Sequence, residues 1–258
     1  MDFILYIFSG ACVGLAIGVT GVGGGSLMTP LLLLFGFPLH VAVGTDLMYA
    51  TLTKTGGAVI HNQKRNVEWQ LVARLAVGSL PAAVLTILLL AQFDEPSQYG
   101  SLLSTALGFM LMLTSVVLLY RKRIQGIGFP ASTILQWIPK HATSMTIVMG
   151  ILLGVLVTLS SVGAAAIATA VLAIFYPHLS ALKIVATNIC HAVPLTLVAG
   201  LGHIYLGNVD YLLLLALMVG SLPAIVFGTR IAGVIPDRIL QSILASTLLI
   251  VGVKFAFF

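Results

Sequence analysis

Charged side chains are scarce in this chain. Asp, Glu, Lys and Arg make up only 7% of its 258 residues, whereas a soluble domain carries about 25%. Hydrophobic residues reach 59% and form long uninterrupted runs. Because about 20 apolar residues span the hydrocarbon of a bilayer, the composition excludes an ordinary soluble fold. It predicts an all-α polytopic membrane protein with almost no domain outside the lipid bilayer.

Cysteines and metal-ligand clusters are equally rare. The two cysteines, Cys12 and Cys190, both lie in apolar segments, so we expect free thiols and neither a disulfide nor a metal site. No G-x-S-x-G or H-E-x-x-H motif is present, and no pair of acids lies within one apolar run. We therefore expect a protein that is not an enzyme and that uses no cofactor and no metal.

The net charge of +5 does not indicate a nucleic-acid partner. The basic residues lie mainly in short segments between apolar runs: Lys64, Arg65, Arg121, Lys122, Arg123, Lys140, Arg230 and Arg238. Lys and Arg in short loops orient membrane helices with those loops in the cytoplasm. The segment 121–142, which is polar and basic, is therefore expected to be cytoplasmic.

A sequence repeat divides the chain into two halves. "VGSLPAAV" at 77–84 recurs as "VGSLPAIV" at 219–226, and "NVEW" at 66–69 recurs at the same offset as "NVDY" at 208–211. Close to the start of each half, "VTGVGGGSLMT" is matched by "LSSVGAAAIAT". We predict a first transmembrane repeat at 1–120, a connector at 121–142 and a second repeat at 143–258. Duplicated halves of this size are typical of secondary transporters, whose substrate site lies between the halves.

The first segment of each half leaves two topologies open. Residues 3–37 are too long for one crossing and too short for two full ones. A single tilted crossing makes the halves parallel, whereas a broken, re-entrant segment followed by three transmembrane helices makes them inverted. The inverted arrangement keeps Arg230 and Arg238 on the cytoplasmic side and is the one we predict.

A glycine-rich stretch interrupts the first apolar segment. Irregular backbone is tolerated at membrane depth only where it is buried in protein or lines a cavity, and the helix that follows would direct free N–H groups toward an anion. Candidate substrate-binding residues are Gly23, Gly24, Gly25, Ser26 and Thr29, with Ser161 and Gly163 in the second half. The alternative is that these small residues only allow helices to pack closely.

Asp46 is the only acid well inside an apolar run, and Lys54 follows it eight residues later. Ionisable groups inside a membrane segment are costly and usually functional, so both are candidates for coupling or gating. Asp46 could instead cap its own helix, and Lys54 could extend its ammonium to the interface. The repeat mate of Asp46 is Asn188, and Thr45 and Thr187 precede the two residues. We place Thr45, Thr187 and Asn188 in the substrate site.

Three histidines are further candidates. His61 and His203 are repeat mates at the ends of their apolar runs, and we predict a gating or interfacial capping role for both. His191 lies one turn from Asn188, so we expect it to line the same cavity.

These motifs together resemble the TauE/SafE sulfite exporter family, also called the toluene sulfonate uptake permease family. The resemblance rests on "GVGGGSLMTP", "HVAVGTDL", "NVEW", "HLSALKIVATN" and "GNVDY", and it covers essentially the whole chain. It implies a transporter of sulfite, sulfonates or related sulfur oxyanions in the bacterial inner membrane. Family members usually have a serine where this chain has Asp46, and Lys54 is not expected in most of them.

The residues and the resemblance agree on a secondary transporter of small sulfur-containing anions. Rocking of one half against the other would give alternating access. An inside-negative potential opposes anion entry, which favours export unless protons accompany the anion, with Asp46 as the first candidate carrier. The alternatives are an anion channel and an uptake permease for another small anion.

Overall fold

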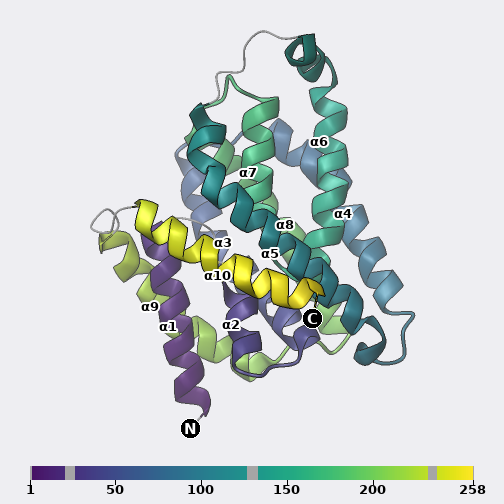
Figure 1. Ribbon diagram of the computed structural model, residues 1–258, viewed down its shortest axis with the longest axis vertical. Helices are drawn as coiled ribbons and strands as arrows, with labels where there is room; N and C mark the ends of the chain where they lie inside the picture. Colours follow the sequence, from purple (N-terminus) through teal and green to yellow (C-terminus); the bar gives the residue numbers. More distant parts are fainter. Residues whose placement is uncertain (1, 21–26, 127–132, 232–236, 258) are drawn as a thin grey trace.

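The computed structural model describes residues 2–20, 27–126, 133–231 and 237–257, which fold into ten α-helices without a strand (Figure 1). The helices are α1 (Asp2–Thr20), α2 (Met28–Leu34), α3 (Leu39–Gln63), α4 (Trp69–Leu90), α5 (Pro96–Gly126), α6 (Thr133–Ser160), α7 (Ala164–Phe175), α8 (Ala181–Tyr205), α9 (Tyr211–Ile231) and α10 (Asp237–Phe257). The expected all-helical class is confirmed. Each half contributes one short helix, α2 or α7, between longer ones.

Five segments among the described residues are long and apolar enough to cross a membrane. They are Trp69–Leu90, Pro96–Leu119, His141–Ser160, Ala181–Tyr205 and Tyr211–Gly228. α3 has 25 residues, as many as α8, and carries the buried Asp46 and Lys54. The chain is a multi-pass membrane protein.

The polarity of the fold suits a lipid environment. Large apolar side chains such as Val77, Leu85 and Phe227 point outward from α4 and α9, whereas Thr45, Ser79 and other polar side chains are buried. An apolar exterior of this extent would be an aggregation hazard in water but is the surface that hydrocarbon requires. The chemistry-bearing side chains are therefore concentrated in the interior.

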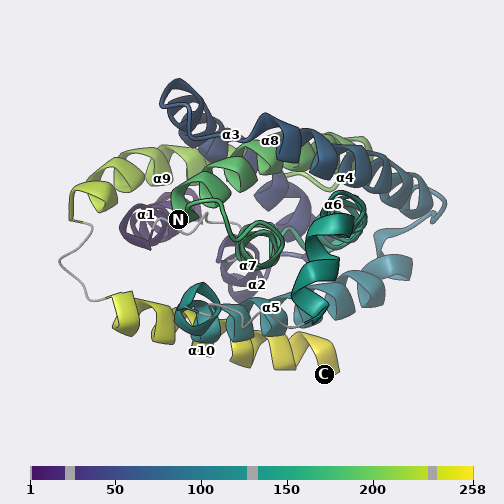
Figure 2. The same cartoon turned by 90° about the horizontal axis from the view of Figure 1, so that it is seen from above.

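Helices of the two halves pack closely against each other through glycine. A Cβ at Gly14 of α1 would meet the backbone of Ser221 in α9, and a Cβ at Gly154 of α6 would meet the backbone of Ser79 in α4. The two contacts involve residues matched by the sequence repeat. Small residues of this kind let helix backbones approach in membranes. As a result α1 lies along α9 and α6 lies along α4 (Figure 2).

The centre of the molecule is the antiparallel pair α3 and α8. The Thr51 hydroxyl donates to that of Thr196 at 2.9 Å, Gly44 packs against His203 near one end, and Gly57 packs against Ile189 near the other. α5 and α10 also run antiparallel, because Ser104 bonds the carbonyl of Phe255 whereas Ser115 bonds that of Ala245. In these two pairs, helices at matched positions in the two halves therefore run antiparallel.

α3 and α8 end in the same way. The N–H of Asn66 bonds the carbonyl of His61 at 3.1 Å, and the N–H of Asn208 bonds that of His203 at 2.9 Å. The residue before each asparagine is left-handed, with φ of 54° at Arg65 and 73° at Gly207. These are the features of a Schellman C-cap. The two loops consequently leave opposite ends of the α3–α8 pair.

The interruptions predicted from the sequence fall between helices. α1 ends at Thr20 and α2 starts at Met28, with the glycine-rich 21–26 lying outside the described residues. The second interruption separates α6 from α7 at 161–163. The expected connector 121–142 is partly helical, because α5 continues to Gly126 and α6 begins at Thr133.

Candidate functional site

The break between α6 and α7 has a defined geometry. Ser160 ends α6, and its hydroxyl donates to the carbonyl of Leu156 and accepts from the N–H of Val162. Ser161 has a φ of 58° and Gly163 one of 93°. A positive φ is rare for a serine and marks a locally strained backbone. The strain turns the chain so that α7 begins inside the protein, with Gly163 as its N-cap.

Two hydroxyls at this break have no hydrogen-bond partner. The Ser161 side chain is 3% exposed, and its Oγ is unpartnered. Oγ1 of Thr114, from α5, lies against Gly163 and is likewise buried and unpartnered. Buried hydroxyls are normally bonded, and the first turn of a helix adds free N–H groups and a positive partial charge. The start of α7 therefore combines two buried hydroxyls with the positive end of a helix.

The carboxylate of Asp46 faces the same region from α3. Its Oδ2 accepts from both the N–H and the hydroxyl of Thr29, at 3.1 and 2.5 Å. The Ser161 side chain lies near enough to Asp46 to act on its carboxylate, although neither Ser161 Oγ nor Asp46 Oδ1 forms a hydrogen bond of good geometry. α3 begins at Leu39, so Asp46 does not cap its own helix. It instead caps the first turn of α2.

Lys54 is the buried cation of this region. It is 9% exposed, too little for a lysine that extends into the interface, and it interacts electrostatically with Asp46 and with His191 of α8. Among the described residues, the one salt bridge joins Lys183 and Glu68 at 2.5 Å. Lys54 and Asp46 therefore act on each other across a gap.

The second half repeats these contacts with other chemistry. Asn188 donates from Nδ2 to the hydroxyl of Thr169 at 3.1 Å, which matches the bond between Asp46 and Thr29. Nε2 of His191 lies 2.8 Å from the Ser79 hydroxyl, whereas Nδ1 has no partner. The polar interior thus has an acidic side and an uncharged amide side.

On the acidic side, Tyr49 is the repeat mate of His191. It faces Ser221 of α9 and also interacts electrostatically with Asp46. Both hydroxyls are buried, and they lie close enough to act on each other without forming a hydrogen bond of good geometry. These two hydroxyls extend the polar interior from the α7 break toward α9.

Thr45 and Thr187 form a reciprocal pair of contacts between the halves. The Thr45 hydroxyl accepts from the N–H of Asp210 at 3.1 Å, and that of Thr187 accepts from the N–H of Glu68 at 3.0 Å. Each hydroxyl anchors the loop that follows the central helix of the other half. Neither belongs to the unpartnered groups.

The two gating candidates differ in their surroundings. His203 is fully buried, and its Nε2 lies 3.0 Å from the carbonyl oxygen of Thr158. Its Nδ1 lies 3.2 Å from Nδ2 of Asn208, which also donates to the Tyr99 hydroxyl at 3.0 Å. His61 is only partly buried, and its Nδ1 has no partner. We call the end of the central pair at which α8 terminates the α8 end, and the end at which α3 terminates the α3 end. His203 is held in a hydrogen-bond network at the α8 end, and its repeat mate His61 forms no such network at the α3 end.

The structure thus brings together part of the residue set expected from the sequence. The polar interior around α3, α8 and the α6–α7 break is lined by seven of them: Thr29, Asp46, Lys54, Ser161, Gly163, Asn188 and His191. His61 and His203 lie at opposite ends of the central pair. Gly23, Gly24, Gly25 and Ser26 lie outside the described residues.

Sequence reasoning missed Tyr49 and Thr114. The repeat signals Tyr49, because it aligns with His191, but nothing in the sequence distinguishes Thr114 from the other hydroxyls of α5. Within the described part of the chain, no group of three His, Cys, Asp or Glu side chains is arranged to hold a metal ion.

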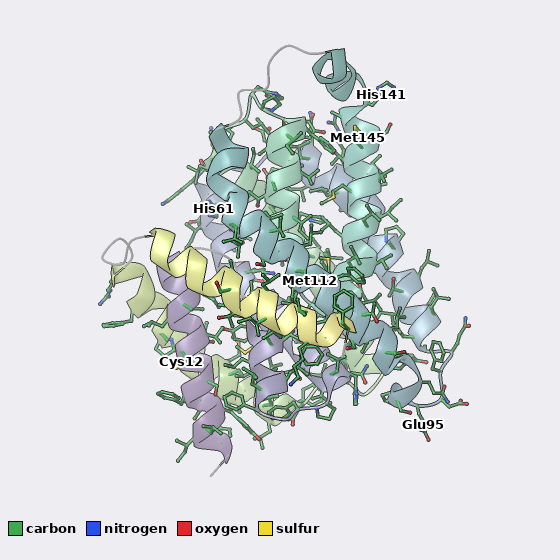
Figure 3. All side chains as sticks on the ribbon, in the orientation of Figure 1. Cys12, His61, Glu95, Met112, His141 and Met145 are labelled. Atoms are coloured by element: carbon green, nitrogen blue, oxygen red, sulfur yellow. The ribbon has the colours of Figure 1, made fainter. Side chains whose placement is uncertain are left out.

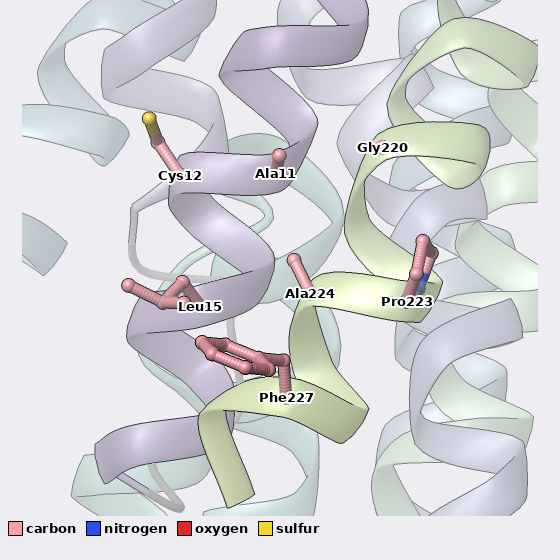
Figure 4. Close-up of a pocket in the computed structure, with 7 residues that line it drawn as sticks. All are labelled: Ala11, Cys12, Leu15, Gly220, Pro223, Ala224 and Phe227. Carbon is pink, nitrogen blue, oxygen red and sulfur yellow. The ribbon is translucent and has the colours of Figure 1, made fainter. Parts of the chain in front are cut away.

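A hollow lies on the outer surface between α1 and α9 (Figure 4). It is lined by apolar groups, including Leu15, Pro223 and Phe227, together with Cys12. Such a lining suits hydrocarbon and offers no charge to an anion. The polar interior is therefore the candidate site.

The chain is a multi-pass helical protein with an apolar surface and a charged, polar interior, an architecture that membrane transporters share. The chain belongs to the TauE/SafE sulfite exporter family, whose description reads "Sulfite exporter TauE/SafE" and whose model matches residues 6–255. The resemblance seen in the sequence is confirmed across nearly the whole chain.

Relatives from Bacillus subtilis (strain 168) support this assignment. The chain is 35% identical to "Probable membrane transporter protein YjnA" over 250 residues, which covers 96% of this chain and 97% of the relative. It is 29% identical to "Probable membrane transporter protein YdhB" over 264 residues, with both chains fully covered. No solved structure matches the chain.

Proposed function

We propose that this protein is a secondary transporter that carries small sulfur-containing oxyanions, such as sulfite or an organosulfonate, by alternating access. The observation that carries the proposal is the pair of buried, unpartnered hydroxyls of Ser161 and Thr114 at the start of α7, with the buried cation Lys54 in the same polar interior. Its family and its relatives support the transporter class.

The donor set suits an oxyanion. A pyramidal or tetrahedral anion accepts several hydrogen bonds, and the first turn of α7 supplies N–H groups and a positive partial charge beside Ser161. Lys54 adds a full positive charge, and His191 and Asn188 supply polar atoms from α8. Binding an anion would satisfy hydroxyls that are otherwise left unbonded at a cost of about 1–3 kcal/mol each.

Inverted repeats provide the basis for alternating access in this proposal. Support comes from the antiparallel course of α3 against α8 and of α5 against α10, and from the reciprocal contacts of Thr45 and Thr187. Two halves of similar fold and opposite orientation can exchange conformations, which opens one end of the central pair and closes the other.

The two ends of the central pair differ as such a mechanism requires. The network of His203, Asn208 and Tyr99 ties the α8 end, whereas His61 at the α3 end makes no matching side-chain contact at Nδ1. In the state that opens the α8 end, we expect the hydrogen bonds of the His203 network to break. His61 and Asn66 would then close the α3 end.

The charges support an assignment of the two ends to sides of the membrane. Tyr99 follows the acidic loop at 94–95 and bonds Asn208, so that loop lies at the α8 end. Figure 3 shows Glu95 and His141 at opposite extremes of the molecule. By the positive-inside rule, the end with Arg65 and the connector 121–142 is cytoplasmic in the bacterial inner membrane. The inside-negative potential then assists export of an anion that moves without a proton.

Flux through proteoliposomes tests the proposal. We expect saturable sulfite transport above the protein-free leak, with counterflow driven by sulfite on the opposite side, and a loss of at least tenfold in Ser161→Ala. Ser115→Ala is the matched control, because its buried hydroxyl already bonds a backbone carbonyl. Flux that never saturates and shows no counterflow would indicate a channel, and a carrier that ignores sulfite and sulfonates would indicate a permease for another anion.

A further inference from the structure

α3 carries two buried ionisable groups of opposite charge. The transport of an anion alone does not explain why both are present. Asp46 is 0% exposed and Lys54 is 9% exposed. Moving an unpaired charge out of water costs several kcal/mol even after relaxation, so each of these groups needs compensation. Their separation of eight residues corresponds to a rise of about 12 Å along the helix. They therefore compensate each other without being in direct contact.

The two oxygens of Asp46 have different environments. Oδ2 is held by the N–H and the hydroxyl of Thr29, whereas Oδ1 is buried without a partner. A proton placed on Oδ1 would leave both hydrogen bonds from Thr29 in place. The same atom would then be a donor that faces the region of Ser161.

Charge counting links this carboxyl group to the substrate. With a carboxylate at Asp46 and an ammonium at Lys54, the buried pair is neutral. An incoming monovalent anion would leave one uncompensated negative charge in the interior, and protonation of Asp46 would restore neutrality. Two ligands that compensate each other's charge bind with positive, reciprocal coupling.

The other ionisable groups near α3 do not duplicate this role. On α3 itself, Tyr49 acts on Asp46, and His40 and His61 lie toward the two ends. α8 brings His191 next to Lys54 and His203 against Gly44, whereas Asp210 before α9 and Tyr99 of α5 lie at the α8 end. The repeat mate of Asp46 is Asn188, an amide that takes up no proton.

We propose that Asp46 and Lys54 couple transport to one proton per anion, with the anion replacing the Asp46 carboxylate as the counter-charge of Lys54 while Asp46 binds the proton. The inference rests on the proposed anion carrier and deepens it. The carboxylate gains a proton from the side on which the anion enters and releases it on the side on which the anion leaves. No other bond is made or broken.

Infrared difference spectroscopy of the protein in lipid tests the proton on Asp46. Adding sulfite to the wild-type protein should produce the C=O stretching band of a protonated carboxyl group. The band should be missing in Asp46→Asn and retained in Glu95→Gln, a loop acid outside the site. Binding is followed separately by the sulfite-dependent rise in melting temperature. A protein that binds sulfite but yields no carboxyl band overturns the inference.

Flux under a pH gradient tests the coupling. A gradient of one pH unit should raise sulfite accumulation on the alkaline side by up to about tenfold in the wild-type protein, because one unit corresponds to a factor of ten in proton activity. Asp46→Asn experiences the same sulfite speciation, and whatever counterflow it retains should no longer respond to the gradient. Asp46→Glu, which keeps the carboxyl group, shows whether the site tolerates substitution and should retain the effect.

The outcomes separate the two proposals. Saturable counterflow that responds equally to the gradient in the wild type and in Asp46→Asn overturns the coupling but leaves the anion carrier intact. The absence of any saturable flux or binding with sulfite in the wild type overturns the proposed function itself.

Discussion

Thr29 and Asp46 are joined by two hydrogen bonds to one carboxylate oxygen, and their repeat mates Thr169 and Asn188 are joined by one. In both halves a short helix is thereby fastened to the central helix that follows it. The two contacts differ in chemistry, because the first half uses the ionisable carboxylate of Asp46 and the second half uses the amide of Asn188. The contact that holds α2 is therefore the one that can respond to a proton.

Removing the hydroxyl of Thr29 should destabilise the protein. Thr29→Ala deletes the 2.5 Å bond to Asp46 and leaves a buried carboxylate with one donor fewer, at a cost of about 1–3 kcal/mol. Thr29→Ser should retain most of the stability. Melting temperatures in detergent measure both, with Thr169→Ala as the matched change against an amide, where a smaller loss is expected. Equal melting of Thr29→Ala and wild type would contradict the role of this bond.

Glycine at the interfaces between the halves should not tolerate a methyl group. A Cβ at Gly78 would meet the carbonyl oxygen of Ile147, and a Cβ at Gly220 would meet that of Ile7. Overpacking against backbone typically costs about 1–3 kcal/mol, so we expect both alanine variants to melt at lower temperature. Gly56→Ala is the control, because a Cβ there would meet nothing within 4 Å beyond its own stretch of helix, and it should be neutral or slightly stabilising.

The ends of α3 and α8 should react from opposite sides of the membrane. Gln63 and Tyr205 are exposed and end the antiparallel central helices. In a background without Cys12 and Cys190, a cysteine at Gln63 should be labelled by an impermeant thiol reagent only from the cytoplasmic side. A cysteine at Tyr205 should be labelled only from the other side. Labelling of both from one side would exclude inverted repeats.

The network at His203 should restrict access to the polar interior. His203→Ala removes the partner of the Thr158 carbonyl and one partner of Asn208. We expect severalfold faster reaction of a cysteine at Thr51, at the middle of the central pair, with a reagent added at the α8 end. His61→Ala is the matched variant and should leave this rate unchanged. If His203→Ala leaves it unchanged too, the network does not act as a gate.

Local patterns in the sequence predicted the helical class, the break before Gly163 and the burial of Asp46. Those features follow from apolar run lengths, from glycine content and from the cost of charge in a membrane. The packing partners could not be read in the same way. Nothing in the sequence of α1 specifies α9 as its neighbour, because any helix with small residues at the right spacing could fill that place.

The same limit explains the details of the candidate site. The repeat identifies Asn188 as the mate of Asp46, but not the bond from Thr29 that makes Asp46 a cap for α2. Thr114 enters the site only because α5 crosses the break at Gly163. Contacts of this kind depend on tertiary arrangement, and a single sequence does not encode them as a visible pattern.

The pairing of α1 with α9 and of α4 with α6 interlocks the chain. The residues before 127 include α1 and α4, but their close-packed partners α9 and α6 lie after residue 132. The residues after 132 likewise lack α1 and α4. A fragment that ended between α5 and α6 would expose these close-packing faces to lipid. The two fragments would be expected to complement each other when synthesised as separate chains, since each one supplies the surface that the other lacks.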